Sequence, residues 1–155
     1  VEHGVTEITA GVDIVKEQIA VAAGARNTLP RRPTEPQGHC IECRINAEDP
    51  LNDFAPSPGR IQAVNVPGGP GIRVDTHIFG EYTVPSYYDS LLAKVMAHGR
   101  DREEAIARMQ RALGEFVIEG IKTNVSFMRE VVGSETFRRG MYSTRFLERF
   151  HLGEV

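Results

Sequence analysis

The alternation of side chains in residues 39–47 is the feature that most restricts the fold of this chain. Ile41 and Cys43 occupy one set of alternate positions, and Glu42 and Arg44 occupy the other. Successive side chains of a β-strand point to opposite faces of a sheet, so this segment would be apolar on one face and charged on the other. The pattern predicts a strand whose apolar face lies in a core.

The same two-residue period returns in residues 60–66 and 72–78, which flank a PGGPG turn at 67–71. Arg73 and Asp75 share the polar face of the second of these segments. Three such strands predict an antiparallel β-meander with one polar face. From spacing alone, a solvated surface is the default interpretation of that face.

Helical periodicity appears on both sides of these strands. Residues 12–23 place apolar side chains on one stripe, and Gly24 follows where a glycine commonly ends a helix. Residues 25–38 contain three prolines and predict a surface connection. Further helices are predicted at 91–96, at 101–116 with Asp101 and Glu104 as its N-terminal cap pair, near 124–132 and near 143–150. This order predicts an α+β fold rather than a regularly alternating parallel sheet.

The charge balance excludes some classes of partner. Lys and Arg total 18 and Asp and Glu total 21, a net charge of -3, so we expect no general attraction for nucleic acid or an anionic membrane. No apolar run approaches the ~20 residues that span a bilayer. A disulfide between two cysteines three positions apart could not stabilise a domain of 155 residues, which favours a reducing compartment. We therefore expect a cytoplasmic protein.

Cys40 and Cys43 have the spacing of half a zinc site or of a redox pair. If residues 39–47 form a strand, the two thiols point to opposite faces and cannot bind one ion together. We therefore expect no metal site in this chain and interpret Cys43 as a small core residue. A zinc or redox protein remains the alternative hypothesis for this pair.

The segment EYTVPSYYDS, residues 81–90, allows two interpretations. Its aromatic side chains and Asp89 could wall a pocket for a planar ligand. Equally, Asp89 or Ser90 could cap a helix that begins at Leu91. The pattern does not choose between a pocket wall and a cap.

Arg44 is the most chemically versatile residue on the predicted polar faces. Its planar fork stays charged and can donate two parallel hydrogen bonds to a carboxylate, a phosphate or an enolate-like oxygen. Glu42, two residues away on the same face, could hold this fork in place.

Seven segments in order resemble the C-terminal part of biotin carboxylase, the ATP-grasp component of acetyl-CoA, propionyl-CoA, methylcrotonyl-CoA and pyruvate carboxylases. The resemblance runs nearly end to end. The segments are VEHGVTE (1–7), GVDIVKEQIAVAAG (11–24), GHCIECRINAEDP (38–50), PSPGRI (56–61), PGGPGIRVDTHI (67–78), YTVPSYYDSLLAKV (82–95) and EGIKTNV (119–125).

This resemblance implies a division of the chain into two parts. Residues 1–30 would be the helical end of the ATP-grasp domain. Residues 37–155 would be the biotin carboxylase C-terminal domain, a mostly antiparallel β-meander packed with C-terminal helices.

The resemblance also implies roles for five residues. In this family ATP phosphorylates bicarbonate to carboxyphosphate, which releases CO2 beside biotin. Glu2 would be the general base that deprotonates bicarbonate, and the amide of Val1 would help to hold that anion. Arg44 would stabilise the enolate oxygen of deprotonated biotin, and Asp89 would lie near Arg44 and the biotin ring. Thr144 would lie beside the adenine.

The implied cofactors are ATP, Mg2+ or Mn2+ with ligands outside this segment, and biotin on a biotin carboxyl carrier protein. The implied partners are bicarbonate, a carboxyltransferase component, a second copy of the chain and an N-terminal part of the same chain. Acetyl-CoA carboxylase, in fatty acid biosynthesis, is the favoured assembly.

Two departures from the family pattern bear on activity. Gly4 stands where the family usually has proline. The family's metal-binding glutamate, ATP lid and bicarbonate-binding arginine and glutamine would lie upstream of Val1, so we expect the 155 residues alone to be inactive. The alternative function is a non-catalytic dimerisation or scaffold module.

Overall fold

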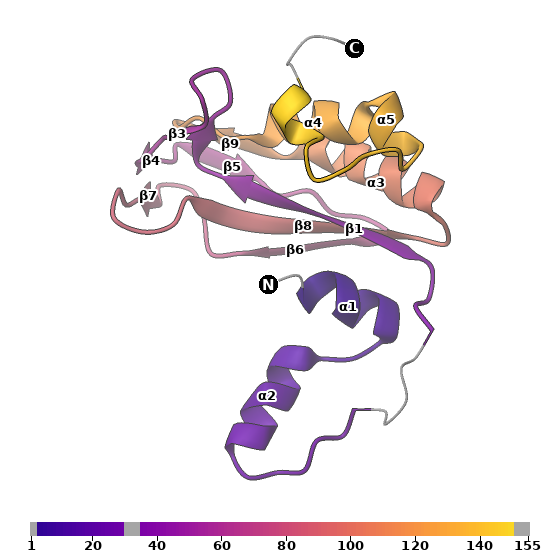
Figure 1. The fold of residues 1–155 in the computed structure, drawn as a ribbon. Coiled ribbons are helices and arrows are strands. Elements are labelled where there is room, and N and C mark those ends of the chain that lie inside the picture. The colour runs from indigo at the N-terminus through magenta and orange to yellow at the C-terminus, as the bar shows by residue number, and fades with distance from the viewer. Residues whose placement is uncertain (1–2, 30–34, 151–155) are drawn as a thin grey trace.

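The computed structural model describes residues 3–29 and 35–150 of the chain. Helices and short strands alternate with long loops (Figure 1). In chain order the elements are α1 (His3–Ala10), α2 (Ile14–Ala22), β1 (His39–Asn46), β2 (Glu48–Asp49), β3 (Ala55–Pro56), β4 (Gly59–Arg60), β5 (Ala63–Asn65), β6 (Ile72–Thr76), β7 (Thr83–Val84), β8 (Leu91–Gly99), α3 (Arg102–Glu115), β9 (Val117–Glu119), α4 (Val125–Gly133), α5 (Glu135–Arg138) and the short 3-10 helix η1 (Leu147–Arg149).

A three-stranded antiparallel sheet forms the middle layer, with β8 between β1 and β6. The predicted α+β class and the strand at 39–47 are confirmed. The predicted meander order is wrong, because β1 and β6 are not neighbours of a strand at 60–66. That segment is divided into β4, which pairs with β7, and β5, which pairs with β9.

The central strand β8 occupies residues that the sequence assigned to a helix. Its side chains Leu92, Val95 and Met96 are at most 1% exposed. A strand covered on both faces reads as a continuous apolar run, and periodicity cannot distinguish such a run from a buried helix. The prediction of a helix at 91–96 is therefore wrong.

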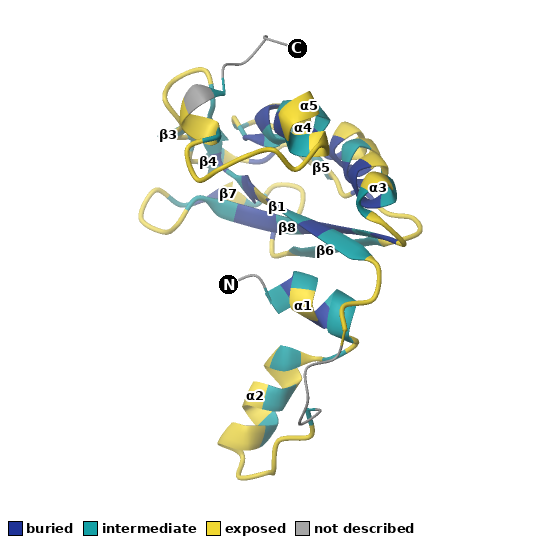
Figure 2. Ribbon diagram, turned by 45° about the vertical axis from the view of Figure 1, so that its right-hand side comes forward, coloured by how far each residue is buried: buried dark blue, intermediate teal, exposed yellow. Residues whose placement is uncertain are grey.

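Helices α3 and α4 cover one face of this sheet (Figure 1). The Asp101 side chain accepts a hydrogen bond of 2.8 Å from the backbone of Glu104, which confirms the predicted cap of α3. The apolar face of β1 lies in this layer, as does one side of β8 (Figure 2). The shared core consists of Ile41, Cys43, Ile45, Ala93, Val95, Ala97, Ala105, Ile106, Met109, Ala112, Leu113, Phe116 and Val132.

The N-terminal helices lie on the opposite face of the sheet (Figures 1 and 2). Helix α1 packs closely against the strands, while α2 projects away from them. Gly24 has a φ of 88° after α2, as expected of a glycine that ends a helix. The apolar stripe of this helix is not buried by the part of the chain that the structure describes, since Val15 and Ile19 are 45% and 66% exposed.

The segment after α5 contains less helix than the sequence predicts. Within 143–150 the structure has the short helix η1, whereas the predicted helix near 124–132 is confirmed by α4. Tyr142 stacks on Phe137 of α5 with ring centroids 5.3 Å apart, so an aromatic contact helps to pack this segment against α5. Among the described residues no helix has the length and apolar character needed to cross a membrane.

Candidate functional site

The register of the sheet arranges its polar face in two rows. Residues directly opposite each other on antiparallel strands have side chains on the same face. One row contains Arg44, Lys94 and Asp75, in the order β1, β8 and β6. The next row contains Glu42, Met96 and Arg73. Side chains far apart in the sequence thus form one surface on the side of the sheet away from α3.

Helix α1 covers the second row at very close range. A Cβ atom at Gly4 would lie 2.0 Å from the Met96 sulfur and 3.3 Å from Oε2 of Glu42. Glycine at this position therefore permits the contact between helix and sheet. The Glu42 Oε2 atom is buried and has no hydrogen-bond partner within the described chain. No ion pair joins Glu42 to Arg44 there, so the prediction that Glu42 holds the Arg44 fork is wrong.

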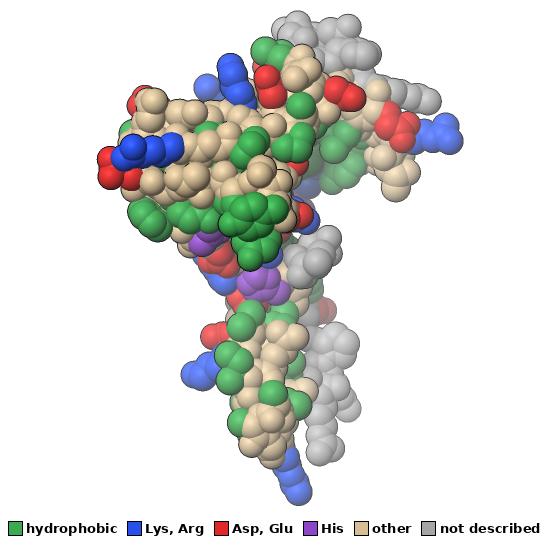
Figure 3. Space-filling view, turned by 90° about the vertical axis from the view of Figure 1, so that its left-hand side faces the viewer, with side chains coloured by type: hydrophobic (Ala, Val, Ile, Leu, Met, Phe, Trp, Pro, Cys, Tyr) green, Lys and Arg blue, Asp and Glu red, His purple; other side chains and the backbone are tan. Residues whose placement is uncertain are grey.

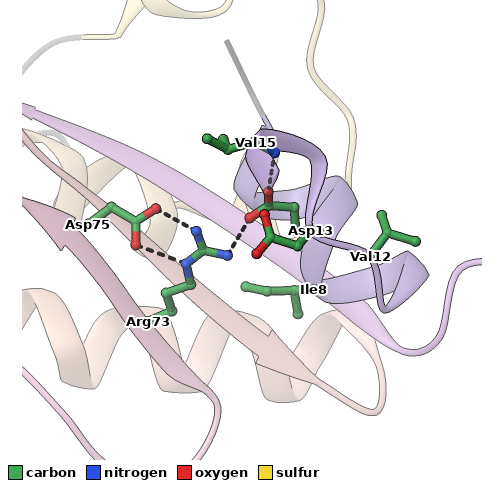
Figure 4. Close-up of a pocket in the computed structure, with 7 residues that line it drawn as sticks. Ile8, Val12, Asp13, Val15, Arg73 and Asp75 are labelled. Carbon is green, nitrogen blue, oxygen red and sulfur yellow. Dashed lines mark hydrogen bonds and ion pairs between the residues drawn. The ribbon is translucent and has the colours of Figure 1, made fainter. Parts of the chain in front are cut away.

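Arg73 of β6 binds two carboxylates, Asp75 on its own strand and Glu7 of α1, and the second contact joins α1 to the sheet (Figure 4). Its Nε and Nη2 atoms donate to the two oxygens of Asp75 at 2.8 and 2.7 Å, and its Nη1 donates to Glu7 at 2.6 Å. The other Glu7 oxygen accepts hydrogen bonds from the backbone of Ile14 and Val15 at the start of α2. Histidine, acidic and basic side chains lie close together where the N-terminal helices meet the rest of the molecule (Figure 3).

The environment of Glu7 favours its ionised form. Burial alone would raise the pKa of this carboxyl group, because it disfavours the charged form. The hydrogen bonds from Arg73, Ile14 and Val15 outweigh burial, so the pKa of Glu7 lies below its ordinary value of 4.5. The same contacts with Asp75 and Glu7 raise the pKa of Arg73.

We expect Glu7→Gln to destabilise the chain by about 2 kcal/mol, because it leaves Arg73 with a neutral partner in a half-buried site. The stabilisation from Glu7 is present above about pH 4.5 and is lost as the pH falls through its lowered pKa. Urea unfolding at pH 7 and at pH 3 measures this. The variant and the wild type should differ at pH 7, and the difference should be smaller at pH 3. An equal difference at both pH values would contradict the expectation.

A pocket of about 610 Å³ opens beside the first row. Arg44 forms part of one wall, and His77, Tyr82 and Tyr88 form others. Tyr88 is 75% exposed, so an aromatic surface lies at the pocket mouth. The remaining lining residues are Val84, Pro85, Asp89, Leu91 and Leu92. Volume and lining fit a small planar ligand with one anionic group.

Asp89 does not cap a helix, since a strand follows it. Its Oδ1 accepts a hydrogen bond of 2.8 Å from the backbone of Leu91, which orients the start of β8. This contact removes the cap interpretation and leaves Asp89 as a pocket-lining carboxylate. An adjoining hollow of about 290 Å³ shares His77, Leu91 and Leu92 with this pocket and includes Lys94.

Asn124 fixes the backbone that carries Arg44. Its side chain, 2% exposed, donates to the Arg44 carbonyl at 3.1 Å and accepts from the backbone of Asn46 at 2.9 Å. The register of β1 against β8 shifts between Ile45 and Asn46. Asn124 therefore stabilises β1 at an irregularity next to Arg44.

The structure brings together only some of the predicted site residues. Arg44 and Asp89 line one pocket. Glu2 and Val1 lie outside the described residues. Thr144 is exposed and does not line the pocket that contains Arg44; it belongs to the segment between α5 and η1, which lies on the helical side of the sheet (Figure 1). Lys94 was not singled out by the sequence, which predicted a helix at 91–96 and therefore no cross-strand partner for it.

The two cysteines lie as the strand predicts. Cys43 is 5% exposed in the core and Cys40 is half-buried on the other face. Burial, with a smaller contribution from Glu42, raises the pKa of Cys40 to about 11 and that of Cys43 to about 12. No group of three His, Cys, Asp or Glu side chains in residues 3–29 and 35–150 is arranged to hold a metal ion.

We therefore expect both thiols to react slowly with alkylating reagents at pH 7.5, because the thiolate is the reactive form. A pKa of about 11 leaves fewer than roughly one Cys40 thiol in 1,000 ionised at this pH. Thiol titration of native and urea-unfolded chain measures this, with the unfolded chain as the control. Rapid modification of the native protein, or rapid oxidation to a disulfide, would support a redox pair instead.

The fold and the pocket define an α+β module in which an arginine-lined hollow lies on the face of an antiparallel sheet away from α3. Residues 42–149 match the family model of the biotin carboxylase C-terminal domain. The chain belongs to this family.

Curated relatives match nearly the whole chain. A pyruvate carboxylase subunit of Methanothermobacter thermautotrophicus is 48% identical over 153 residues, which cover 99% of this chain and 31% of that protein. Biotin carboxylase 1 of Bacillus subtilis is 51% identical over 150 residues, which cover 97% and 33%. The chain thus spans about a third of the length of these relatives.

Solved structures have the same fold. The biotin carboxylase domain dimer of Hydrogenobacter thermophilus 2-oxoglutarate carboxylase, in complex with MgADP, ADP and bicarbonate, superimposes with a TM-score of 0.90 at 47% identity. The match covers 96% of this chain and 33% of that chain. The biotin carboxylase subunit of a pyruvate carboxylase gives a TM-score of 0.90 at 42% identity, and the match covers 96% of this chain and 33% of that one.

Proposed function

We propose that this chain is the C-terminal part of a biotin carboxylase, an ATP-dependent ligase that transfers a carboxyl group from bicarbonate to biotin on a carrier protein. The observation that carries the proposal is the position of Arg44. It is a permanently charged fork on a strand anchored by Asn124, and it opens into a pocket with Tyr88 and Asp89.

The chemistry of the proposed reaction explains why a permanent cation is useful there. Biotin must lose its N1′ proton before it can attack CO2, and its carbonyl oxygen then gains negative charge. A guanidinium held beside that oxygen stabilises the developing charge more than it stabilises neutral biotin. In this proposal Arg44 binds the oxygen, the pocket aromatic side chains pack against the ring, and Asp89 lies at its edge.

The nucleotide and metal requirements belong to the proposal as well. ATP supplies the energy to activate bicarbonate, and Mg2+ or Mn2+ accompanies the nucleotide. The ligands of that ion would come from another part of the protein. Glu2 as base, Val1 as anion donor and Thr144 beside the adenine remain proposals that depend on that part.

The proposed partners are the biotin carboxyl carrier protein, a carboxyltransferase component and a second copy of the protein. A dimer is supported by the dimeric Hydrogenobacter relative. We propose acetyl-CoA as the final acceptor and fatty acid biosynthesis in the cytoplasm as the setting. Because relatives include parts of pyruvate and 2-oxoglutarate carboxylases, acceptor assays must compare acetyl-CoA, pyruvate and 2-oxoglutarate.

The proposed division places residues 1–30 at the end of the ATP-grasp domain and residues 37–155 in the C-terminal domain. This division is supported by the order of the elements, since the helices α1 and α2 precede the proline-containing connection and the sheet follows it. The contact between Glu7 and Arg73 would then join the two domains.

The test is incorporation of radiolabelled bicarbonate into free biotin. The complete subunit that carries this segment should incorporate label only with ATP and a divalent cation present, and the 155-residue chain alone should incorporate none. A complete subunit that hydrolyses no ATP in response to biotin would contradict the proposal. It would favour the non-catalytic scaffold.

A further inference from the structure

Two cations lie side by side on the face of the sheet that also carries α1. Arg44 of β1 and Lys94 of β8 are direct partners in the antiparallel register. The Cβ atoms of such partners lie about 5 Å apart, and like charges in this position destabilise a sheet. Such a pair is favourable only when negative charge compensates it.

No carboxylate in the described chain forms an ion pair with either cation. Asp75 lies opposite Lys94 on the other side, but both of its oxygens accept hydrogen bonds from Arg73. Asp89 orients the backbone of Leu91. Within residues 3–29 and 35–150, no hydrogen bond or ion pair engages the side chain of Arg44 or of Lys94.

Both cations open into adjoining hollows. Arg44 lines the larger and Lys94 the smaller, and the two hollows share His77, Leu91 and Leu92. His3 of α1, the residue after Glu2, also lines the smaller one. An anionic group at the boundary between the hollows would lie within reach of both side chains.

We propose that Arg44 and Lys94 bind one anionic oxygen group between them, so that Lys94 is a second cation of the site. The inference rests on the proposed function, in which this group is the biotin oxygen that becomes negative when biotin loses its proton. Two converging charges stabilise that oxygen more than one does, since the stabilisation increases with each fixed positive charge nearby. Lys94 supplies charge and removes no proton.

The experiment compares Lys94→Met, Lys94→Arg and the control Lys122→Met in the complete subunit, with free biotin as the acceptor. Lys122 is exposed and lies outside both hollows. We expect Lys94→Met to lower kcat about 10-fold without changing KM for ATP, because it removes one partner of a developing charge. Lys94→Arg should keep kcat within about 3-fold of the wild type, and Lys122→Met should match the wild type.

A double variant tests whether the two cations act on the same group. If they do, Arg44→Met with Lys94→Met should lose less activity than the product of the two single losses. A double variant whose loss of activity equals the product of the two single losses would overturn the inference. So would wild-type kcat in Lys94→Met, or equal losses in Lys94→Met and Lys94→Arg. These results leave the proposed function intact, whereas a wild-type subunit without biotin-dependent turnover overturns both.

Discussion

Replacing Arg44 by methionine is expected to lower biotin-dependent turnover by the complete subunit roughly 100-fold, a loss of about 3 kcal/mol of transition-state stabilisation. Methionine keeps the length and apolar stem of the side chain but cannot bind a negative oxygen. The guanidinium makes no side-chain ion pair within the described chain, so its removal should leave the melting temperature nearly unchanged. Initial rates at saturating ATP and bicarbonate, with biotin varied, measure the effect.

The matched control is Arg139→Met, an exposed arginine paired with Glu135 on the helical side of the sheet. It should retain wild-type turnover. An Arg44→Met enzyme that carboxylates biotin within about 3-fold of the wild-type rate would remove the reason for assigning the pocket to biotin.

Replacing Gly71 by alanine is expected to destabilise the chain by about 3 kcal/mol. Gly71 has a φ of 74°, and a Cβ there would lie 2.4 Å from the His98 carbonyl oxygen and 2.4 Å from Nη1 of Arg108. That arginine donates to the same His98 carbonyl, and the backbone of His98 donates to the Gly71 carbonyl at 2.8 Å. The added methyl group would therefore disrupt the contact between the turn, the end of β8 and α3.

Gly68→Ala in the same PGGPG turn provides the control, because a Cβ there meets no atom within 4 Å. Its free energy of unfolding should lie within about 0.5 kcal/mol of the wild type. Urea denaturation of both variants compares them directly. Equal stabilities for the two variants would show that the turn does not require glycine at position 71.

The sequence correctly predicts the strand β1 and the polar face on which Arg44 lies, because the alternation of side chains is a local signal. It predicts β8 wrongly, because a central strand lacks alternation. That error also concealed the position of Lys94 beside Arg44, since this position follows from strand pairing and a helix has no such partner. Correct assignment of β8 requires knowledge that β1 and β6 pair on either side of it.

The link between α1 and the sheet could not be predicted from local patterns either. Glu7 and Arg73 are 66 positions apart, and neither occurs in a segment whose spacing indicates a partner. The resemblance to biotin carboxylase predicted that Arg44 and Asp89 lie near each other, and both residues line the same pocket. The resemblance gave no role to Lys94, whose position beside Arg44 follows from the strand register alone.

The central claim is that biotin binds at the pocket formed by Arg44 and the tyrosine segment. Photolabelling of the complete subunit with a photoreactive biotin derivative, followed by trypsin digestion and mass spectrometry, tests it most directly. Trypsin releases residues 74–94 as one peptide, which contains His77, Tyr82, Tyr88 and Asp89. The account predicts that this peptide carries the label and that excess free biotin prevents labelling. Biotin-protected label confined to peptides from α3, α4 or α5, on the other side of the sheet, would contradict it.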